Sequence, residues 1–353
     1  MASFFKRPAV AFLYAAALCW PSLAPGAETI DLLLAHDQSQ VPPNTHIAAV
    51  SEEFRRLVAK SSDGRIRIDI LPNAMLGGNY DVAKLVDKNV LSSALVPLGA
   101  AAKIYPPLRA SLIPFSFESI DTARKVFAGP YKQKLREGMV EKSNLFLVGF
   151  VDVGGFDILT NIDREILLPE DMWGLNIASI PDLPELDSMI KASGAKAVKV
   201  SINEKFNLLY SHALDGQMGT IDLALAQGMP SVQGHATLTE HLYAPYVWLF
   251  SKSALDGLGP DDRGLLLKSA EDALRTTLDR IQALEKSQAP LKKLRQSVTV
   301  HVPTPEERRQ FSTLMQPAAE EAILDSLGPQ GAEFVSAFKA AIQAAERSGK
   351  ESR

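Results

Sequence analysis

Cysteine is almost absent from this chain, which has 353 residues and one Cys, at position 19. Cys19 lies in the apolar run from Pro8 to Trp20, which follows Lys6 and Arg7. The run is shorter than the roughly 20 apolar residues that span a bilayer, and small residues come just after it. Residues 1–26 are therefore predicted to be a secretory signal peptide.

Cleavage of this peptide would leave a mature chain without cysteine. That would exclude a thiol nucleophile, a cysteine-ligated zinc site and a structural disulfide. A lipoprotein anchor on Cys19 is the alternative, but Leu18 and Trp20 are bulky at positions where such processing sites usually carry small residues. We therefore expect an exported protein that folds without covalent cross-links.

Long apolar runs and an excess of basic residues are also absent after residue 26. No stretch approaches 18 apolar residues, so we expect no membrane span in the mature chain. Loss of Lys6 and Arg7, with no acid in the leader, moves the formal net charge from -4 to -6, which does not suit a nucleic-acid partner. The remaining 327 residues exceed what one core usually organises, so two lobes are expected. Periplasmic solute receptors fit this description first, and secreted hydrolases second.

Catalytic and metal-binding signatures are weak or missing. No G-x-S-x-G, H-E-x-x-H or P-loop pattern occurs. Ser188 and Lys191 have the S-x-x-K spacing of penicillin-interacting enzymes, but the S-D-N and K-T-G companions are absent. None of the six histidines forms an i, i+4 pair for a metal. We expect a protein that is not an enzyme and that carries no metal or other cofactor.

Hydrophobic periodicity predicts one α/β layout that occurs twice. In the first half, strands are expected at 29–35, 65–71, 93–98 and 145–151, with helices at 47–60, 81–89 and 119–126. In the second half, strands are expected at 175–178 and around 198, with helices at 183–193 and 203–212. Between the halves, the paired glycines in 152–157 suit a chain crossing from one lobe to the other.

Two features stand out at the ends of these elements. His36 and Asp37 follow the first strand at its carboxyl end, which is the edge where open α/β sheets bind ligands. Further along, a long helix is expected from Pro260 to about Lys286. Thr304-Pro305-Glu306-Glu307 is a capping box that starts a terminal helical region.

Short motifs follow one another in a fixed order from residue 30 to about 260. They are Phe54, Leu57 and Val58 with Gly64-Arg65-Ile66, Leu71-Pro72-Asn73 and Leu76-Gly77-Gly78; Pro114-Phe115-Ser116-Phe117 with Gly129; Asp171-Met172-Trp173-Gly174-Leu175-Asn176-Ile177 with Pro181; Ser193-Gly194-Ala195 with Glu204, Leu209 and Asp215-Gly216-Gln217; and His241 before Tyr243. In this order and spacing the chain resembles the solute-binding proteins of TRAP transporters, the DctP type.

The resemblance implies a two-lobe periplasmic-binding-protein fold, in which each lobe is a mixed sheet flanked by helices and a long helix spans both. Expected boundaries are a first lobe of 28–152 plus about 245–284, and a second lobe of 153–244 plus about 285–353. The resemblance also implies a periplasmic receptor that closes on a small organic solute. It would deliver this solute to a TRAP-type membrane permease driven by an ion gradient, without an ATPase.

Departures from the family pattern concern the residues that hold the ligand. Typical members carry a carboxylate-clamping Arg where this chain has Ala178, and a second Arg where it has Phe156. A family Asn corresponds to Gly219, beside Met218. Hydrogen bonds to charged groups contribute roughly 1.5 to 3 kcal/mol each, so a cleft without these arginines should reject the usual carboxylate unless other donors replace them. Arg109 and Arg164 are the candidate replacements, with surface solvation as the alternative for each.

The predicted lining of the cleft follows from these positions. It comprises His36, Asp37, Asn79, Phe156, Ala178, Asp182, Ile202, Met218, Gly219 and Tyr243. Such a wall favours a neutral, amphiphilic or aromatic solute, and the acids leave room for an amine. The alternative for Asp37, Asp152, Asp157 and Asp182 is a role as solvated turn or cap residues. A solute sensor or scaffold that keeps the fold but no longer serves transport is the alternative function.

Overall fold

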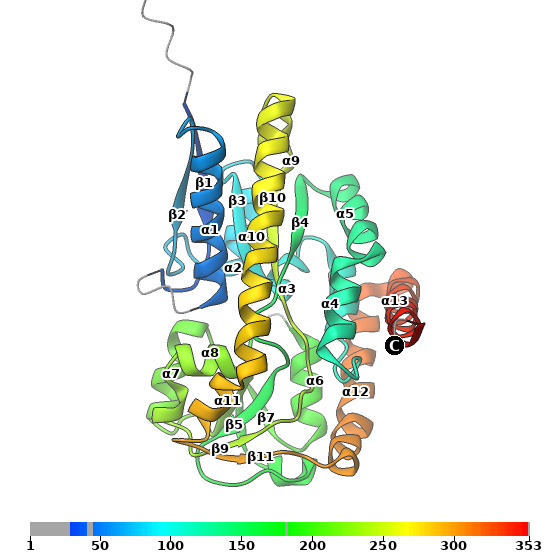
Figure 1. The fold of residues 1–353 in the computed structure, drawn as a ribbon. Helices are drawn as coiled ribbons and strands as arrows, with labels where there is room; N and C mark the ends of the chain where they lie inside the picture. Colours follow the sequence, from blue (N-terminus) through cyan, green and yellow to red (C-terminus); the bar gives the residue numbers. More distant parts are fainter. Residues whose placement is uncertain (1–28, 41–44, 181–182, 352–353) are drawn as a thin grey trace, which may run out of the picture.

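Two mixed β-sheets, each covered by helices, form the molecule in the computed structural model (Figure 1). The structure describes residues 29–40, 45–180 and 183–351. The predictions for the signal peptide and for Asp182 therefore fall outside the described residues, as does the side chain of Ile202. The predicted two-lobe fold, with a mixed sheet flanked by helices in each lobe, is confirmed.

The first lobe is built on a five-stranded sheet of order β2-β1-β3-β10-β4. Its strands are β1 (Ile30–Ala35), β2 (Ile66–Leu71), β3 (Ser93–Pro97), β4 (Leu145–Val151) and β10 (Tyr246–Ser251). The first three strands pair in parallel, whereas β10 pairs antiparallel with both β3 and β4. Strand β10 comes from much later in the chain and lies between β3 and β4, so it joins these two strands into one sheet.

Helices cover both faces of the first sheet. They are α1 (His46–Ser61), α2 (Asn79–Asp87), α3 (Leu98–Ala101), η1 (Pro106–Leu112), α4 (Ile120–Ala128), α5 (Pro130–Lys142), α9 (Lys252–Asp256), α10 (Pro260–Ser287) and α13 (Gly331–Glu351). Helix α1 begins where the Thr45 hydroxyl accepts a hydrogen bond from the Ala48 N–H. Its apolar face packs with α10 against the sheet, where Phe54 meets Trp248 edge-on at a centroid distance of 4.9 Å.

The second lobe has a six-stranded sheet of order β11-β9-β5-β8-β6-β7. Its strands are β5 (Ile158–Asn161), β6 (Asn176–Ser179), β7 (Lys196–Lys199), β8 (Gly216–Gly219), β9 (His235–Thr237) and β11 (Thr299–His301). Its helices are η2 (Pro169–Met172), α6 (Pro184–Ala192), α7 (Ile202–Tyr210), α8 (Ile221–Ala226), η3 (Met229–Ser231), α11 (Ala289–Leu294), α12 (Pro305–Leu327) and η4 (Gly328–Gln330). Apolar residues of α6 and α12 pack on one face, and those of α7 and α8 pack on the other.

The chain crosses between the lobes between β4 and β5, returns between β9 and β10, and passes again along α10. Helix α10 confirms the predicted long helix and runs from beside the first sheet toward the second (Figure 1). Within the described ranges, no helix is both long and apolar enough to cross a membrane.

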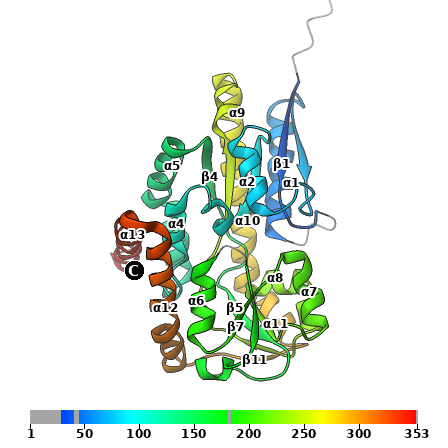
Figure 2. The ribbon, with the colours of Figure 1, turned by 180° about the vertical axis from the view of Figure 1, so that it is seen from behind.

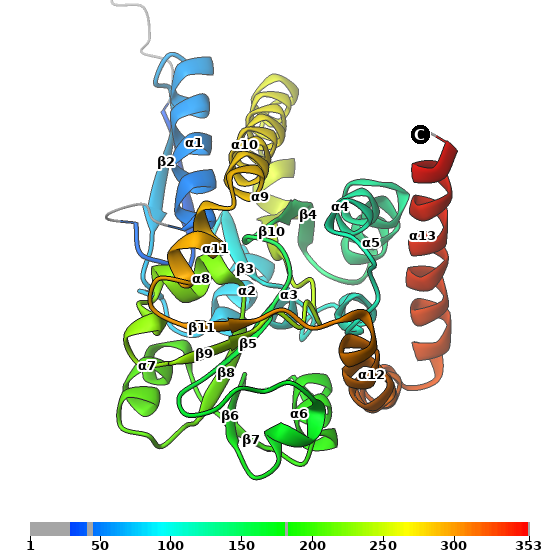
Figure 3. The same cartoon turned by 60° about the horizontal axis from the view of Figure 1, so that its bottom comes forward.

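The final helix departs from the expected lobe boundary. The prediction assigned about 285–353 to the second lobe, but α13 packs against α4, α5 and η1 of the first lobe (Figure 3). The cause is its apolar face, where Phe338 is fully buried and contacts Phe117 and Tyr131. Helix α12 carries the chain back from the second lobe to the first.

Candidate functional site

A small pocket lies where the two lobes meet. Its first-lobe lining is Gln38, Thr45, His46, Ile47 and Tyr246, and its second-lobe lining is Val153, Asp222 and Leu223. Both ribbon views place α8 below the N-terminal end of α1, across the gap between the lobes (Figures 1 and 2). Because residues from both lobes line it, this pocket marks the candidate ligand cleft.

Asp37, at the carboxyl end of β1, is bonded to two residues of the first-lobe lining, Gln38 and Tyr246. Its carboxylate accepts hydrogen bonds from Asn79 Nδ2 at 2.8 Å, from Gln38 Nε2 at 2.8 Å and from the Tyr246 hydroxyl at 3.1 Å. These three donors hold the carboxylate, so Asp37 is not the solvated turn residue of the alternative. The structure therefore brings Asp37 and Asn79 together, and it adds Tyr246, which the sequence did not reveal.

His36 lies next to this group but turns into the lobe. Its Nε2 lies 3.0 Å from Gln40 Oε1 and 3.3 Å from the Ser51 hydroxyl, and its Nδ1 accepts from the Gln38 N–H at 3.2 Å. Burial lowers the pKa of His36, which favours the neutral ring. His36 therefore supports the loop that carries Asp37.

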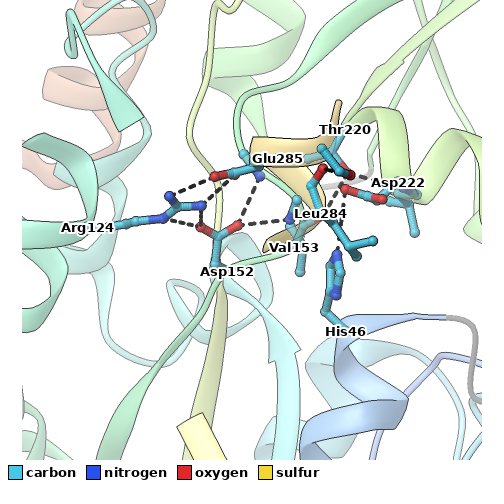
Figure 4. A network of polar contacts seen from close by, with 12 residues as sticks. His46, Arg124, Asp152, Val153, Thr220, Asp222, Leu284 and Glu285 are labelled. Carbon is cyan, nitrogen blue, oxygen red and sulfur yellow. Dashed lines mark hydrogen bonds and ion pairs between the residues drawn. The ribbon is translucent and has the colours of Figure 1, made fainter. Parts of the chain in front are cut away.

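The first crossing segment is held by Arg124 and Asp152 (Figure 4). Arg124 Nε donates to Asp152 Oδ2 at 2.8 Å, while Asp152 Oδ1 accepts from the N–H groups of Gly154 and Gly155 at 2.8 and 2.9 Å. Both glycines have positive φ, which only glycine adopts readily. Asp152 is thus a structural element of the crossing, in contrast to the solvated alternative.

Two contacts connect this crossing and α1 to α8. The Thr220 hydroxyl donates to the Val153 carbonyl at 2.8 Å, and His46 Nε2 lies 3.6 Å from Asp222 Oδ2. His46 belongs to the first lobe and Asp222 to the second, so this pair joins the lobes directly beside the pocket (Figure 4).

The aromatic residues predicted for the lining lie against the first lobe. Phe156 is half-buried and meets Tyr243 edge-on at a centroid distance of 6.2 Å. Tyr243 is buried in the aromatic cluster with Phe117 and Phe127. Phe156 therefore contributes an apolar ring to the crossing segment, at the position for which the resemblance implied a cation.

The small residues of the predicted lining lie on the second sheet. Ala178 is buried in the core shared with α7 and α8. At Gly219, an added Cβ would have only Gln217 Oε1 within 4 Å, at 3.6 Å, so the sheet face beside Gln217 is open there. Met218 points to the opposite face and packs on the core formed with α6 and α12, since side chains alternate along a strand. The structure thus separates Met218 from Gln217 and Gly219.

Sequence reasoning missed a cation in this part of the second lobe. Lys205 of α7 is half-buried, and its Nζ donates to Gln217 Oε1 at 2.8 Å. Burial lowers the pKa of Lys205 to about 8, against the opposing effect of the Asp157 charge. A lysine on an amphipathic helix is usually solvated, so its residue type did not indicate a site. The Asp-Gly-Gln motif, which contains Gln217, was the one sequence feature that pointed to this part of the second lobe.

Asp157 is the acidic counterpart of Lys205. It is half-buried, and burial raises the pKa of its carboxyl to about 7 while the Lys205 charge lowers it. Its backbone is bonded to the second crossing, with its N–H donating to the Leu242 carbonyl at 2.8 Å. The solvated alternative for Asp157 therefore does not describe its surroundings.

Neither arginine that was considered as a replacement clamp lies free in the cleft. Arg109 is buried and its Nη1 donates to Glu185 Oε2 at 2.7 Å, which joins η1 to α6. Arg164 is exposed on the second lobe, where its backbone N–H donates to Asn161 Oδ1 at 2.9 Å. Among the residues that the structure describes, no group of three His, Cys, Asp or Glu side chains is arranged to hold a metal ion.

Comparison with known proteins identifies the family to which this chain belongs. The family described as bacterial extracellular solute-binding protein, family 7, or DctP, matches residues 38–325. The chain belongs to this family. As a DctP-family protein it is a solute-binding receptor, which confirms the resemblance to TRAP-type receptors inferred from the sequence motifs.

Two relatives of this DctP-family protein are named for the solutes that they bind. The C4-dicarboxylate-binding periplasmic protein DctP of Rhodobacter capsulatus is 26% identical over 338 residues, which cover 92% of this chain and 94% of the relative. The 2,3-diketo-L-gulonate-binding periplasmic protein YiaO of Escherichia coli is 24% identical over 306 residues, which cover 87% and 90%.

Solved structures show the same fold. The sugar acid binding protein DctPAm of Advenella mimigardefordensis, in complex with galactonate, aligns with a TM-score of 0.81 at 23% identity and covers 90% of this chain and 99% of its own. A TRAP periplasmic solute-binding protein of Desulfovibrio salexigens with bound orotic acid has a TM-score of 0.81 at 18% identity, covering 90% and 100%.

Proposed function

We propose that this DctP-family protein is a periplasmic receptor that captures a small organic solute by lobe closure and delivers it to a TRAP-type membrane permease. The observation that carries the proposal is the pocket lined from both lobes, with the chain crossings beside it held by Arg124, Asp152 and Glu285. Polar groups from both lobes line this pocket, as a receptor that closes on its solute requires.

The solute differs in kind from a carboxylate clamped by arginine. Phe156, Ala178 and Gly219 provide no charged group at the three family positions. Arg109 pairs with Glu185, and Arg164 is exposed. Since none of these positions supplies a bidentate arginine fork, simple dicarboxylates and sugar acids are expected to bind poorly.

Mass spectrometry of solute released from protein expressed in its own periplasm tests the proposal, followed by calorimetry with the identified compound. We expect one small organic solute at near-unit stoichiometry, and a decrease in the radius of gyration in solution when it binds. Tight binding of C4 dicarboxylates or sugar acids would overturn the proposed ligand class. Turnover of the solute by the purified protein would overturn the receptor function.

A sensor or scaffold role is the second candidate, favoured by the same loss of the arginines. Uptake of radiolabelled solute separates the two. A transport receptor predicts that deletion of this gene and deletion of the genes for its permease abolish uptake equally, whereas a sensor predicts normal uptake without the receptor.

A further inference from the structure

Two oppositely charged residues, Lys205 and Asp157, lie beside strand β8 of the second lobe without forming an ion pair: Lys205 Nζ donates to Gln217 Oε1, and Asp157 precedes Ile158, which pairs with Gly219. Lys205 comes from α7, and Asp157 lies one residue before β5. Each changes the titration of the other through its charge, yet no hydrogen bond or ion pair joins these two described residues. Their separation leaves each one able to bind a further group.

The hydrogen-bonding capacity of both groups is largely unused. A lysine ammonium has three N–H donors, and Gln217 Oε1 is the one acceptor that Lys205 Nζ has within the described part of the chain. An ionised carboxylate has about four acceptor sites, and no described side chain donates to that of Asp157. Half-buried charged groups without partners are unfavourable, so a ligand that supplies the partners gains affinity.

The position of Lys205 is fixed by a series of hydrogen bonds between buried polar side chains. Gln217 Nε2 donates to Thr160 Oγ1 at 3.0 Å, and Thr160 Oγ1 donates to Gln233 Oε1 at 2.7 Å. These three residues are 2, 2 and 3% exposed. Because Thr160 holds the amide nitrogen of Gln217, the amide oxygen is directed to Lys205. The Nε2 of Gln233 is enclosed and has no acceptor among the described residues, so the series ends in an unused donor.

At Gly219, beside these hydrogen-bonded side chains, there is room for an added methyl group. Gln217 and Gly219 share one face of β8, since they are two residues apart. The added Cβ at Gly219 meets only Gln217 Oε1. Strand β8 leads directly into Thr220 and Asp222, and Asp222 lines the pocket between the lobes. The charged pair therefore adjoins the strand that leads to Asp222, on the second-lobe side of the pocket.

We propose that the solute is a small zwitterion, of the amino-acid type, whose carboxylate binds Lys205 and whose ammonium donates to Asp157. This inference rests on the receptor function proposed above. A solute with only an anionic group would bring a second carboxylate near Asp157, and a purely cationic solute would bring a second cation near Lys205. A zwitterion supplies both missing partners and leaves the net charge of the site unchanged. A quaternary ammonium has no N–H, so a primary or secondary amine is required.

Calorimetry on the mature full-length protein with the twenty L-amino acids, β-alanine and 4-aminobutyrate tests the inference, with succinate, D-galactonate and benzyl alcohol as the other charge classes. We expect a zwitterion to bind, and Lys205→Met and Asp157→Asn each to weaken its binding at least about tenfold. Lys199→Met and Asp163→Asn are the matched controls, since both residues are exposed on the second lobe, and they should change affinity less than twofold.

Ligand analogues assign each contact. With the wild type, removal of the amine or amidation of the carboxylate should each weaken binding at least about tenfold. Asp157→Asn should lose the preference for the amine, and Lys205→Met the preference for the carboxylate. A bound neutral or dicarboxylic solute that is unaffected by either variant would overturn the inference and leave the receptor function intact. Absence of binding by every class, in protein that folds cooperatively, would contradict the receptor function itself.

Discussion

Arg124 and Glu285 are joined by two hydrogen bonds, with Nη1 donating to Oε2 at 2.9 Å and Nη2 donating to Oε1 at 2.5 Å. Arg124 belongs to α4 of the first lobe, and Glu285 lies near the end of α10, where the chain enters the second lobe. The same guanidinium holds Asp152 at the first crossing. One side chain thus holds two of the segments that pass between the lobes, and so fixes the position of these two segments relative to each other.

Replacement of Arg124 by Met should destabilise the protein by about 3 to 5 kcal/mol, because it leaves the Asp152 carboxylate buried without its cation. Urea unfolding followed by circular dichroism measures the change. Arg67→Met is the control, since Arg67 and Asp31 form an exposed pair that should contribute less than about 1 kcal/mol. Equal losses in the two variants would show that the Arg124 contacts have no special structural role.

Gly154→Ala should disturb the approach of the lobes. Gly154 has φ of +100°, and an added Cβ would clash with Asp222 Oδ2, so the alanine both strains the backbone and displaces Asp222 from His46. We expect a loss of about 1 to 3 kcal/mol from strain, together with a larger radius of gyration in small-angle scattering. Gly174→Ala provides the comparison, since Gly174 has φ of +78° and no atom within 4 Å of the added Cβ. That variant should lose stability without a change in radius.

Arg109→Met should separate stability from ligand binding. Glu185 is buried and paired with Arg109. The substitution leaves the Glu185 carboxylate buried without a cation, so the free energy of unfolding should fall by about 3 to 5 kcal/mol. Solute affinity, measured by calorimetry at a temperature where the variant is folded, should change less than twofold. Arg164→Met should alter neither quantity, since Arg164 is exposed. A large loss of affinity in Arg109→Met at unchanged stability would instead identify Arg109 as a ligand clamp.

Much of the fold follows from local patterns in the sequence. The amphipathic period predicts α1 and α10 to within one residue, and Thr304 with Glu307 marks the start of α12 through a capping box that the structure contains. Strand β10, with sequence Tyr-Val-Trp-Leu-Phe-Ser, was missed. All of its residues are buried, so it lacks the alternation that reveals a half-exposed strand.

The candidate site was harder to predict, because it depends on which chain segments meet. Asp37 and Asn79 are 42 positions apart, and the sequence placed both at the cleft because of the strand end and the family motif. Lys205 carried no such signal, since only the approach of α7 to β8 shows that its amine meets Gln217. Met218 was predicted to line the cleft together with Gly219, but adjacent residues of a strand point to opposite faces, and Met218 packs on the core formed with α6 and α12.

His241 should make the protein sensitive to acid. It is fully enclosed, and burial, with a smaller contribution from the Arg308 charge, lowers its pKa to about 3. The unfolded chain binds a proton at this ring near pH 6.5, whereas the folded chain stays neutral, so stability is present above pH 6.5 and is lost as the pH falls toward 3. Between pH 7 and 4.5 the loss from this ring should be about 2 to 3 kcal/mol.

His241→Gln, measured by urea unfolding at both pH values, should remove that part of the difference, while the remainder reflects other groups such as His36, whose pKa is also lowered. His212→Asn, at an exposed histidine, should leave the pH dependence as in the wild type, and an equal effect of the two substitutions would contradict the role assigned to His241.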